Sequence, residues 1–333
     1  MSTQNSKDST SVEFQKPSSS NTPYSNRKYA FTNSTLVASV VLINYNQGHY
    51  LVESLNSVMN QTYPDIEIIV IDGGSSDNSI EILKEYPGVK WISEADNSSG
   101  HAFAKGVQLA RGSFIYFLAS SDGFFDNEWI EKSVNLLHLN PHISLVSADV
   151  LGIDQNSILN GYKWPKGKIV DWSNKELFFS WLLKGVGITP ITFAIKKDVL
   201  NLCAPKIDQM QDPNRTDSVD YFWCLAGNFF SSGFIGIKIA MISSFARFHE
   251  DRVDDAAYLS RQRNQLHRLI ISHRRQFILS FRPATFISPL GENVKSQEIA
   301  YFEVVWRILI SKLYSLCQKA FKSILKLCQM NRY

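Results

Sequence analysis

The feature that most constrains the fold is a regular alternation of short apolar runs with segments of helical periodicity. Residues 36–44 and 66–72 are almost wholly apolar, and between them Leu51, Leu55 and Val58 recur at helical spacing. Short runs that are apolar on both faces are typical of strands buried inside a parallel sheet. Parallel neighbours need a crossover connection, which the intervening helix supplies.

The alternation continues along the chain. Residues 89–93, 114–118 and 143–148 predict three further strands, with helical segments before the second and the third of them. Repeated strand–helix units place a mostly parallel sheet between two layers of helices. We therefore expect an α/β fold with a mostly parallel sheet flanked by helices, followed by a C-terminal helical extension.

Composition and charge limit the classes of partner. The 333 residues are 44% hydrophobic and 20% charged, which is ordinary for a globular protein, and the net charge of +3 is too small to indicate nucleic acid. The four cysteines show no metal-ligand spacing and suit reduced thiols. We expect a cytoplasmic protein that binds no nucleic acid.

Two segments could be mistaken for targeting or membrane-spanning sequences. Residues 1–34 are rich in Ser, Thr, Asn and Gln and lack the apolar stretch of a signal peptide, so we expect them to be disordered. Residues 221–237 are uncharged, but their glycines, serines and asparagine make them better buried core than bilayer span.

Polar side chains gather at one predicted edge of the sheet. Asn44 and Asn46 end the first strand, Asp72 closes the second, Asp96 lies just beyond the third, and Asp122 follows the fourth. The carboxyl ends of parallel strands form the edge where α/β sheets bind ligands. Converging carboxylates repel one another unless a cation or a hydroxyl-rich ligand lies between them.

Two common phosphate-binding motifs are missing. No GxGxxG follows the first strand, and no GxxxxGK[ST] occurs, which argues against a dinucleotide site and a P-loop. A bound pyrophosphate then needs another source of positive charge. Mg²⁺ or Mn²⁺ bridging carboxylate and phosphate oxygens would supply it, and would neutralise a departing diphosphate.

Six segments in register resemble a known family. They are residues 40–46, 57–64, 69–77, 104–106, 110–112 and 117–122. Together they are similar to the nucleotide-binding half of a family 2 glycosyltransferase with the GT-A fold, of the type that builds bacterial polysaccharides. The resemblance implies a glycosyltransferase domain over residues 35–250, with a nucleotide-sugar half at 35–150 and an acceptor half at 151–250.

The resemblance also implies a donor site. Asp72 would contact the nucleotide base and Asp96 would hold the base or the ribose, although they could also be a turn cap and a loop residue. Lys105 would lie near phosphate or be a solvated helix residue. The residues implied for the donor nucleotide are Asn44, Tyr45, Asn46, Asp72, Asp96, Lys105 and Ser121.

The metal site implied by the resemblance departs from the family pattern. Asp122 would be the metal-binding acid, but the family usually has a second acid where this chain has Ser120 and Ser121. In residues 246–249, which resemble an Arg-x-His element, His249 would be a second ligand and Arg247 would support the site. Imidazole suits Mn²⁺ better than Mg²⁺. Asp122 as a helix cap and His249 as a structural histidine are the alternatives.

The acceptor half should supply the catalytic base. Residues 191–200 resemble the family's strand and helix after the acceptor loop, which we place at residues 161–171. Asp220 would deprotonate the acceptor hydroxyl and allow in-line attack with inversion. Asp217 and Asp212 are alternative bases, and Asp220 could instead be a helix cap.

Residues 251–333 predict a basic amphipathic helical tail. Its two helical segments, residues 256–282 and 301–333, have basic faces, and the second contains a single acid. Such a helix can lie on an anionic membrane, here the inner face of the plasma membrane, or pack on the catalytic domain or a second subunit.

These features predict a hexosyltransferase that uses a nucleotide-diphosphate sugar and a Mn²⁺ or Mg²⁺ cofactor. UDP-sugar is the expected donor, followed by GDP- or dTDP-sugar, and the acceptor would be a glycan or a lipid-linked sugar. The alternative is a catalytically inactive nucleotide-sugar-binding or scaffold protein. It is favoured by Ser121 and by Ala104, which stands where the family commonly has Asn. A nucleotidyltransferase is a weaker rival, because no Gly-rich phosphate loop with Lys or Arg follows the first strand.

Overall fold

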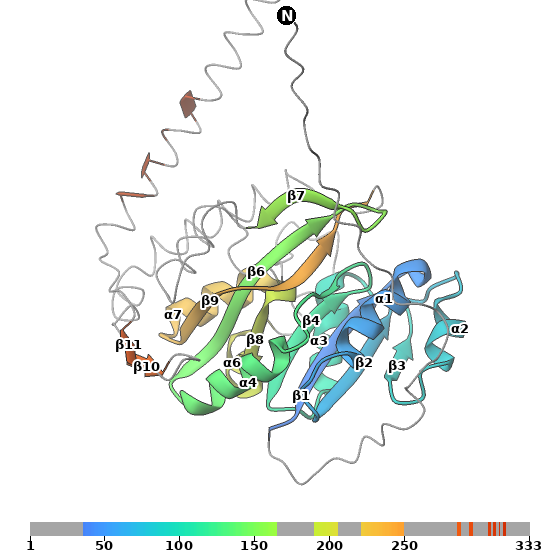
Figure 1. The fold of residues 1–333 in the computed structure, drawn as a ribbon, viewed down its shortest axis with the longest axis horizontal. Coiled ribbons are helices and arrows are strands. Elements are labelled where there is room, and N and C mark those ends of the chain that lie inside the picture. The colour runs from blue at the N-terminus through green and yellow to red at the C-terminus, as the bar shows by residue number, and fades with distance from the viewer. Residues whose placement is uncertain are drawn as a thin grey trace, which may run out of the picture.

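The computed structural model describes residues 36–164, 190–205, 221–249, 285–287 and 293–295, and seven residues between 306 and 317. Over these ranges it shows a nine-stranded mixed sheet and a separate two-stranded one (Figure 1). The large sheet has the order β3-β2-β1-β4-β8-β6-β9-β5, and β7 pairs with β6. The expected α/β architecture, mostly parallel in its first half, is confirmed.

The first half of the sheet is parallel. It consists of β1 (Ala38–Asn44), β2 (Ile66–Asp72), β3 (Lys90–Ser93) and β4 (Phe114–Ala119). The connecting helices are α1 (Gly48–Met59), α2 (Ser79–Lys84) and α3 (Ser99–Leu109). In register, Asn44 lies beside Asp72 and Ile43 beside Ala119, so the strands end at one edge.

The second half of the sheet is mixed. It contains β5 (Gly123–Phe124), β6 (Ile143–Ile153), β7 (Leu159–Trp164), β8 (Phe193–Lys196) and β9 (Ile235–Arg247). β8 is antiparallel to both β4 and β6, whereas β6 and β9 run parallel to each other. The helices here are α4 (Trp129–Leu139), α6 (Lys197–Cys203) and α7 (Tyr221–Ser231), preceded by a short 3-10 turn at Pro190–Thr192.

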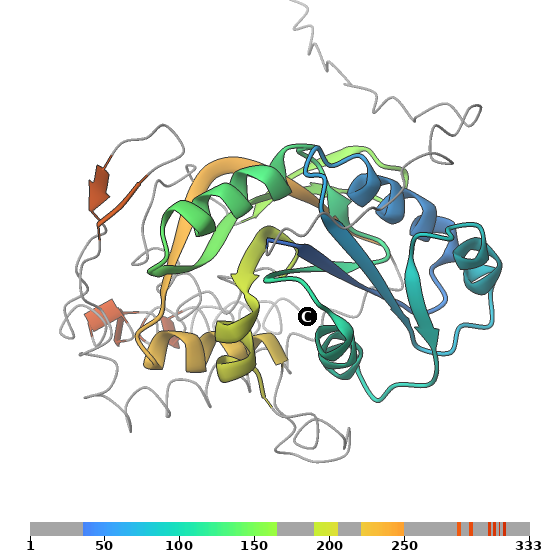
Figure 2. The same ribbon diagram turned by 90° about the horizontal axis from the view of Figure 1, so that it is seen from below.

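Helices cover both faces of the sheet (Figure 2). Because successive side chains of a strand point to opposite faces, β1 contributes Val41 to one apolar cluster and Val40 and Leu42 to the other. The first cluster includes residues of α3, α6 and α7, and the second includes residues of α1, α2 and α4. α3 lies so close to β1 that a Cβ at Gly106 would be 2.2 Å from Val41 Cγ1.

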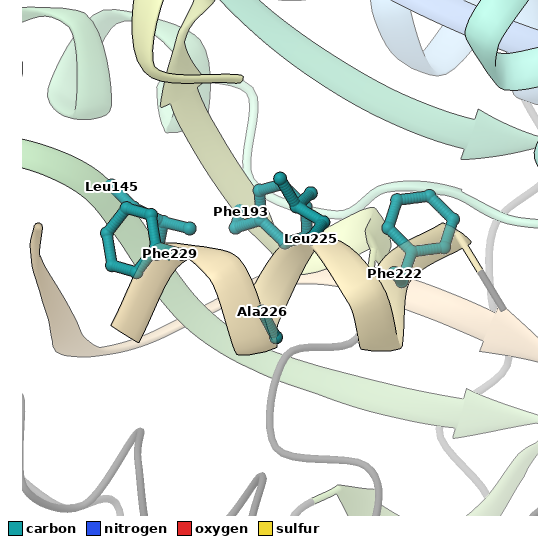
Figure 3. A pocket seen from close by; sticks show the side chains of 6 residues that line it. All are labelled: Leu145, Phe193, Phe222, Leu225, Ala226 and Phe229. Carbon is teal, nitrogen blue, oxygen red and sulfur yellow. The ribbon is translucent and has the colours of Figure 1, made fainter. Parts of the chain in front are cut away.

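Apolar side chains of α7, β6 and β8 line a small cavity of about 10 Å³ (Figure 3). That space is at most the size of one water molecule, and it offers no polar partner for one. It is therefore a packing gap and not a ligand site. Its lining residues are Leu145, Phe193, Phe222, Leu225, Ala226 and Phe229.

One expectation about the later part of the chain was wrong in detail. Residues 161–164, expected in a loop, belong to β7. The antiparallel pair β10 (Thr285–Ile287) and β11 (Asn293–Lys295) lies between the two helical segments expected in the tail, and the residues described between 306 and 317 are helical. The expected disordered segment 1–34 and the three candidate bases, Asp212, Asp217 and Asp220, lie outside the described residues.

No helix within the described ranges combines the length and the apolarity needed to cross a bilayer. Residues 221–237, considered above as a possible span, form α7 and the first residues of β9. Tyr221, Leu225 and Phe229 of this segment are buried in the core, as expected.

The edge of the sheet at the start of β1 is held by a buried carboxylate. Glu67 accepts hydrogen bonds from Ser39 Oγ (2.6 Å), Lys90 Nζ (2.6 Å), and the backbone N–H (2.8 Å) and Nε (3.0 Å) of Arg111. Burial opposes its ionisation, but these hydrogen bonds outweigh burial and lower the pKa of Glu67 to about 2. The ionised side chain thus ties β1, β2, β3 and the end of α3 together.

Glu67→Gln should lower the free energy of unfolding at pH 7 by about 2 kcal/mol, because charge-assisted hydrogen bonds are lost inside the protein. Since the pKa of Glu67 is lowered on folding, its contribution is present above the usual Glu value of 4.5 and is lost as the pH falls towards 2. Urea unfolding at pH 7 and pH 3 measures both effects.

The matched control is Glu81→Gln on the exposed face of α2, which should change stability by less than about 0.5 kcal/mol. An equal effect of the two substitutions at pH 7 would contradict this account of Glu67.

Candidate functional site

The loops after β1 and β2 are locked together by Ser75. Its Oγ donates to Asp72 Oδ1 (2.5 Å) and accepts from the backbone N–H of Asn46 (2.8 Å) and from Asn44 Nδ2 (3.2 Å). Asn46 Oδ1 in turn accepts from the backbone N–H of Ser76 at 2.8 Å. Asn46 has φ +51°, a left-handed conformation that Asn tolerates better than most residues. The Asn residues at the end of β1 therefore build the loops.

Asp72 lies at the centre of this arrangement and is completely buried. Its two oxygens accept from Asn44 Nδ2, Ser75 Oγ, Ser93 Oγ and the backbone N–H groups of Gly74 and Ser75. Burial alone would raise its pKa, but these hydrogen bonds outweigh it and hold the pKa of Asp72 below its usual value. Asp72 thus joins β1, β2 and β3, and its contact with a nucleotide base stays a prediction.

Asp77 links the second loop to α1. Its Oδ2 accepts from the backbone N–H of Gly48, the first residue of α1, at 2.8 Å, and its Oδ1 accepts from Ser79 N (3.0 Å) and Ser79 Oγ (2.6 Å). Asp77 thus satisfies a free donor at the start of α1 and fixes the direction of that helix.

Gly73 directly follows β2 and lies beside these loops. A Cβ at Gly73 would be 3.1 Å from Asp96 Oδ2 and 3.2 Å from Tyr45 Cδ2, so Tyr45 and Asp96 flank this glycine. Tyr45 is 62% exposed. Burial raises the pKa of Asp96, although the nearby Lys105 and His101 oppose this. Lys105 also pairs with Glu94 at 2.7 Å.

Asp122 sits in a tight turn after β4 that Ser54 of α1 fixes. Ser54 Oγ lies 2.7 Å from the carbonyl oxygen of Ser120 and 2.6 Å from that of Asp122. Asp122 Oδ1 accepts from the backbone N–H of Arg247 at 3.0 Å, across the sheet edge. Asp122 and Ser121 are both buried, at 3% and 8% exposure.

Arg247 and His249, at the end of β9, lie against the start of α1. The Arg247 guanidinium lies 4.5 Å from the centroid of the Tyr50 ring, and the His249 ring lies 5.5 Å from it. Arg247 Nη2 pairs with Glu53 Oε2 at 2.6 Å. Asp122 and His249 therefore both lie beside α1, Asp122 at Ser54 and His249 at Tyr50.

Sequence reasoning missed three residues of α1, namely Tyr50, Glu53 and Ser54. Ser54 had a detectable signal, because it lies on the helix face that carries Leu51, Leu55 and Val58. A small hydroxyl on an otherwise apolar helix face indicates a buried hydrogen bond. Tyr50 and Glu53 had no such signal, since their partner Arg247 is nearly two hundred residues away in the chain.

The described part of the chain contains no group of three His, Cys, Asp or Glu side chains placed to hold a metal ion. Asp122 and His249 are the two candidate ligands. A divalent cation at Asp122 would take its remaining ligands from diphosphate oxygens and water, as Mg²⁺ commonly does. The donor set therefore fits a cation that binds together with a diphosphate.

Two buried polar atoms in the first loop have no hydrogen-bond partner among the described residues. They are Asn44 Oδ1 and Gln47 Oε1. Buried acceptors without partners are unusual in folded proteins and commonly mark sites completed by water or ligand. Both atoms lie at the edge where β1 and β2 end, next to Tyr45 in the chain, so this edge is the candidate site for a polar ligand.

Comparison with known proteins agrees with this interpretation. The family model described as Glycosyl transferase family 2 matches residues 39–202, which include β1 to β4, β8 and most of α6. The six segments that carry the expected resemblance, between residues 40 and 122, all lie within that range.

Two curated relatives match part of the chain. A chondroitin synthase of Escherichia coli is 32% identical over 154 residues, which are 43% of this chain and 22% of that protein. The E. coli protein WfgD, a UDP-Glc:alpha-D-GlcNAc-diphosphoundecaprenol beta-1,3-glucosyltransferase, is 29% identical over 169 residues, which are 50% of this chain and 62% of that protein. The chain thus spans less than two thirds of the length of either relative.

A solved structure shares the fold. The crystal structure of S. aureus TarS 1-349 in complex with UDP-GlcNAc matches with a TM-score of 0.54 and 18% identity, over 72% of this chain and 66% of that one. At this identity the likeness shows the fold alone.

Ser75→Ala should lower the free energy of unfolding by about 2 kcal/mol, because it removes three hydrogen bonds and leaves the N–H of Asn46 without its acceptor. Amide exchange at Asn46 and Ser76 should accelerate more than exchange in the core strands. Urea unfolding and hydrogen exchange measure the two effects.

The adjacent Ser76→Ala is the matched control. Ser76 Oγ makes one long contact of 3.4 Å, so its loss should change stability by less than about 0.5 kcal/mol. Equal effects of the two alanines would show that Ser75 does not lock the loops.

Proposed function

The chain belongs to glycosyltransferase family 2 through residues 39–202, and on this premise we propose that it transfers a hexose from a UDP-sugar to a glycan or a lipid-linked acceptor. The observation that carries the proposal is the sheet edge where Tyr45, Asp96 and Asp122 meet loops locked by Asp72 and Ser75. GDP- and dTDP-sugars are the alternative donors.

The donor base would lie on the exposed ring of Tyr45 with Asp96 at its edge. Stacking on an aromatic ring holds any base, and a carboxylate accepts hydrogen bonds from base N–H or ribose hydroxyl groups. Asp72 is fully buried, so it would act on the donor by holding the two loops, and Asn44 and Asn46 would act in the same way. Lys105 is tied to Glu94 and would offset the charge of Asp96.

The diphosphate would bind near Asp122 and Ser121, with Mn²⁺ or Mg²⁺ as cofactor and His249 as a second ligand. Such a cation supplies positive charge to the leaving diphosphate. What this chain contributes is a carboxylate oriented by Ser54 and by the N–H of Arg247, in a buried turn where charges interact more strongly than in water.

The acceptor chemistry would come from the second half of the chain. α7 begins at Tyr221, directly after Asp220, so Asp220 precedes the first turn of a helix packed on the sheet. Asp220 would remove the acceptor proton, and the anomeric carbon would be inverted. WfgD is named for a lipid-linked acceptor, which supports the same class of acceptor here.

A catalytically inactive nucleotide-sugar-binding protein is the second candidate. Ser121 directly before Asp122, and the absence of a three-residue metal cluster among the described residues, favour it. The two candidates share the donor site and differ in whether the bound sugar is transferred.

We expect calorimetry to detect UDP binding that strengthens at least about tenfold with Mn²⁺, because Asp122 would hold a cation that supplies positive charge to the diphosphate. Asp122→Ala should lose that gain. Asp198→Ala, an exposed acid at the opposite edge of the sheet, is the matched control and should bind as wild type does. If UDP, GDP and dTDP all fail to bind, the transferase proposal is wrong.

A third variant, Asp220→Ala, separates a transferase from a scaffold when UDP release from UDP-sugars is measured. Asp220→Ala should keep UDP binding and lose release by at least about a hundredfold. Binding without release by the wild-type chain, for all sugars and acceptors tried, would favour the inactive protein.

The tail would place the enzyme at the membrane where such acceptors reside. Leu309, Ile310, Leu313 and Leu316 are helical and about half or more exposed, and residues 301–333 carry basic residues against one acid. An exposed apolar face in a basic segment suits the surface of an anionic bilayer.

The chain should therefore cosediment with vesicles containing phosphatidylglycerol and not with pure phosphatidylcholine, and Leu309→Glu with Leu313→Glu should abolish this. The wild-type chain could instead bind neither kind of vesicle and form a dimer that the double substitution dissociates. The exposed apolar face of the tail would then be a subunit contact.

A further inference from the structure

Arg247 stands out because its backbone and its side chain serve different parts of the molecule. It is the last residue of β9, and its N–H donates to Asp122 Oδ1 at 3.0 Å. Its side chain is 1% exposed and contacts other elements, among them α1 through Glu53. Few arginines are buried to this degree, and those that are need several partners.

The guanidinium connects two segments that are far apart in the chain. Nη2 pairs with Glu53 of α1 at 2.6 Å, while Nη1 donates to the carbonyl oxygen of Asp154 at 3.1 Å and to Ser157 Oγ at 2.9 Å. The Tyr50 ring of α1 lies beneath it at 4.5 Å. One planar group therefore holds the first turns of α1 against the turn between β6 and β7.

That turn is well defined and strained at one residue. Asp154 Oδ1 accepts from the backbone N–H groups of Asn156 (2.8 Å) and Ile158 (2.9 Å), and Ser157 has φ +64°. A positive φ costs energy for a residue with a Cβ, so it persists only where neighbours enforce it. The bond from Arg247 to Ser157 Oγ is one such contact, and Phe248 N bonds Ile153 O nearby at 2.8 Å.

We propose that Arg247 is a positioning residue of the donor site, which fixes Asp122 by anchoring the end of β9 to α1 and to the β6–β7 turn. The proposal rests on the proposed function, since Asp122 is the acid expected to meet the cation and diphosphate. The backbone N–H can hold Asp122 Oδ1 only while the strand end stays in place, and the side chain keeps it there.

The chemistry of the contact requires an arginine. The guanidinium group donates hydrogen bonds to three acceptors at once, while its planar face lies on the Tyr50 ring. A lysine at this position would keep the charge but could not reach Glu53, Asp154 and Ser157 together. The acidic turn is thus oriented by a residue 125 positions later in the chain that makes its main contacts elsewhere.

The test compares Arg247→Ala and Arg247→Lys with the wild-type chain for Mn²⁺-dependent UDP binding, at a temperature where circular dichroism shows each to be folded. Both should weaken binding by about tenfold or more, since a misplaced carboxylate loses a charge-assisted contact. Arg111→Ala is the matched control, because it also removes an arginine–glutamate pair, at the opposite edge of the sheet.

A purely structural role gives a different result. If the Arg247 variants are less stable but bind UDP and Mn²⁺ as the wild-type chain does, like Arg111→Ala, the proposal is overturned. Binding lost in the Arg247 variants and kept in Arg111→Ala supports it.

A double-mutant cycle decides the case in which the wild-type chain binds no nucleotide and the proposed function itself fails. The unfolding constants of Arg247→Ala, Asp122→Ala and the double variant should differ from additivity by at least about twofold if Arg247 fixes Asp122. Additive effects would overturn the inference independently of any ligand.

Discussion

The buried carboxylate of Asp72 is the interaction on which the rest of the site depends. An ionised group without exposure is stable only when donors surround it, and here Asn44, Ser75, Ser93 and two backbone N–H groups do so. These donors come from the ends of three neighbouring strands. Satisfying one charge therefore forces the loops after β1 and β2 together and leaves Tyr45 exposed over Gly73.

In the second half of the site the buried charge is positive, and it too is stable only because hydrogen-bonding partners surround it. Arg247 is a buried cation, and its partners come from α1 and from the β6–β7 turn. Asp122 is then oriented from two directions, by Ser54 of α1 and by the backbone of Arg247. The first and second halves of the sheet are thus joined through polar contacts at the sheet edge, while apolar packing joins them beneath it.

Much of this could be predicted from local patterns. The apolar runs ending at Asn44 and Asp72 had no alternative to buried strands, and register alone brings their polar ends together. β5 has two residues and no periodicity, and β10 and β11 have three each, so no pattern could reveal them. The role of Asp72 was open for another reason: an acid at a strand end fits both ligand binding and loop stabilisation until its donors are known.

The sequence by itself determined the alternation of strands and helices, the edge where the acids gather, and the family resemblance, because these depend on residues close together in the chain. Only the tertiary structure decided that Asp72 is buried, that Asp77 accepts a hydrogen bond from the first residue of α1, and that Arg247 contacts Glu53 and Ser157. Those contacts join positions up to nearly two hundred residues apart. The energy of a buried charge depends on which donors folding brings to it, and no local pattern carries that information.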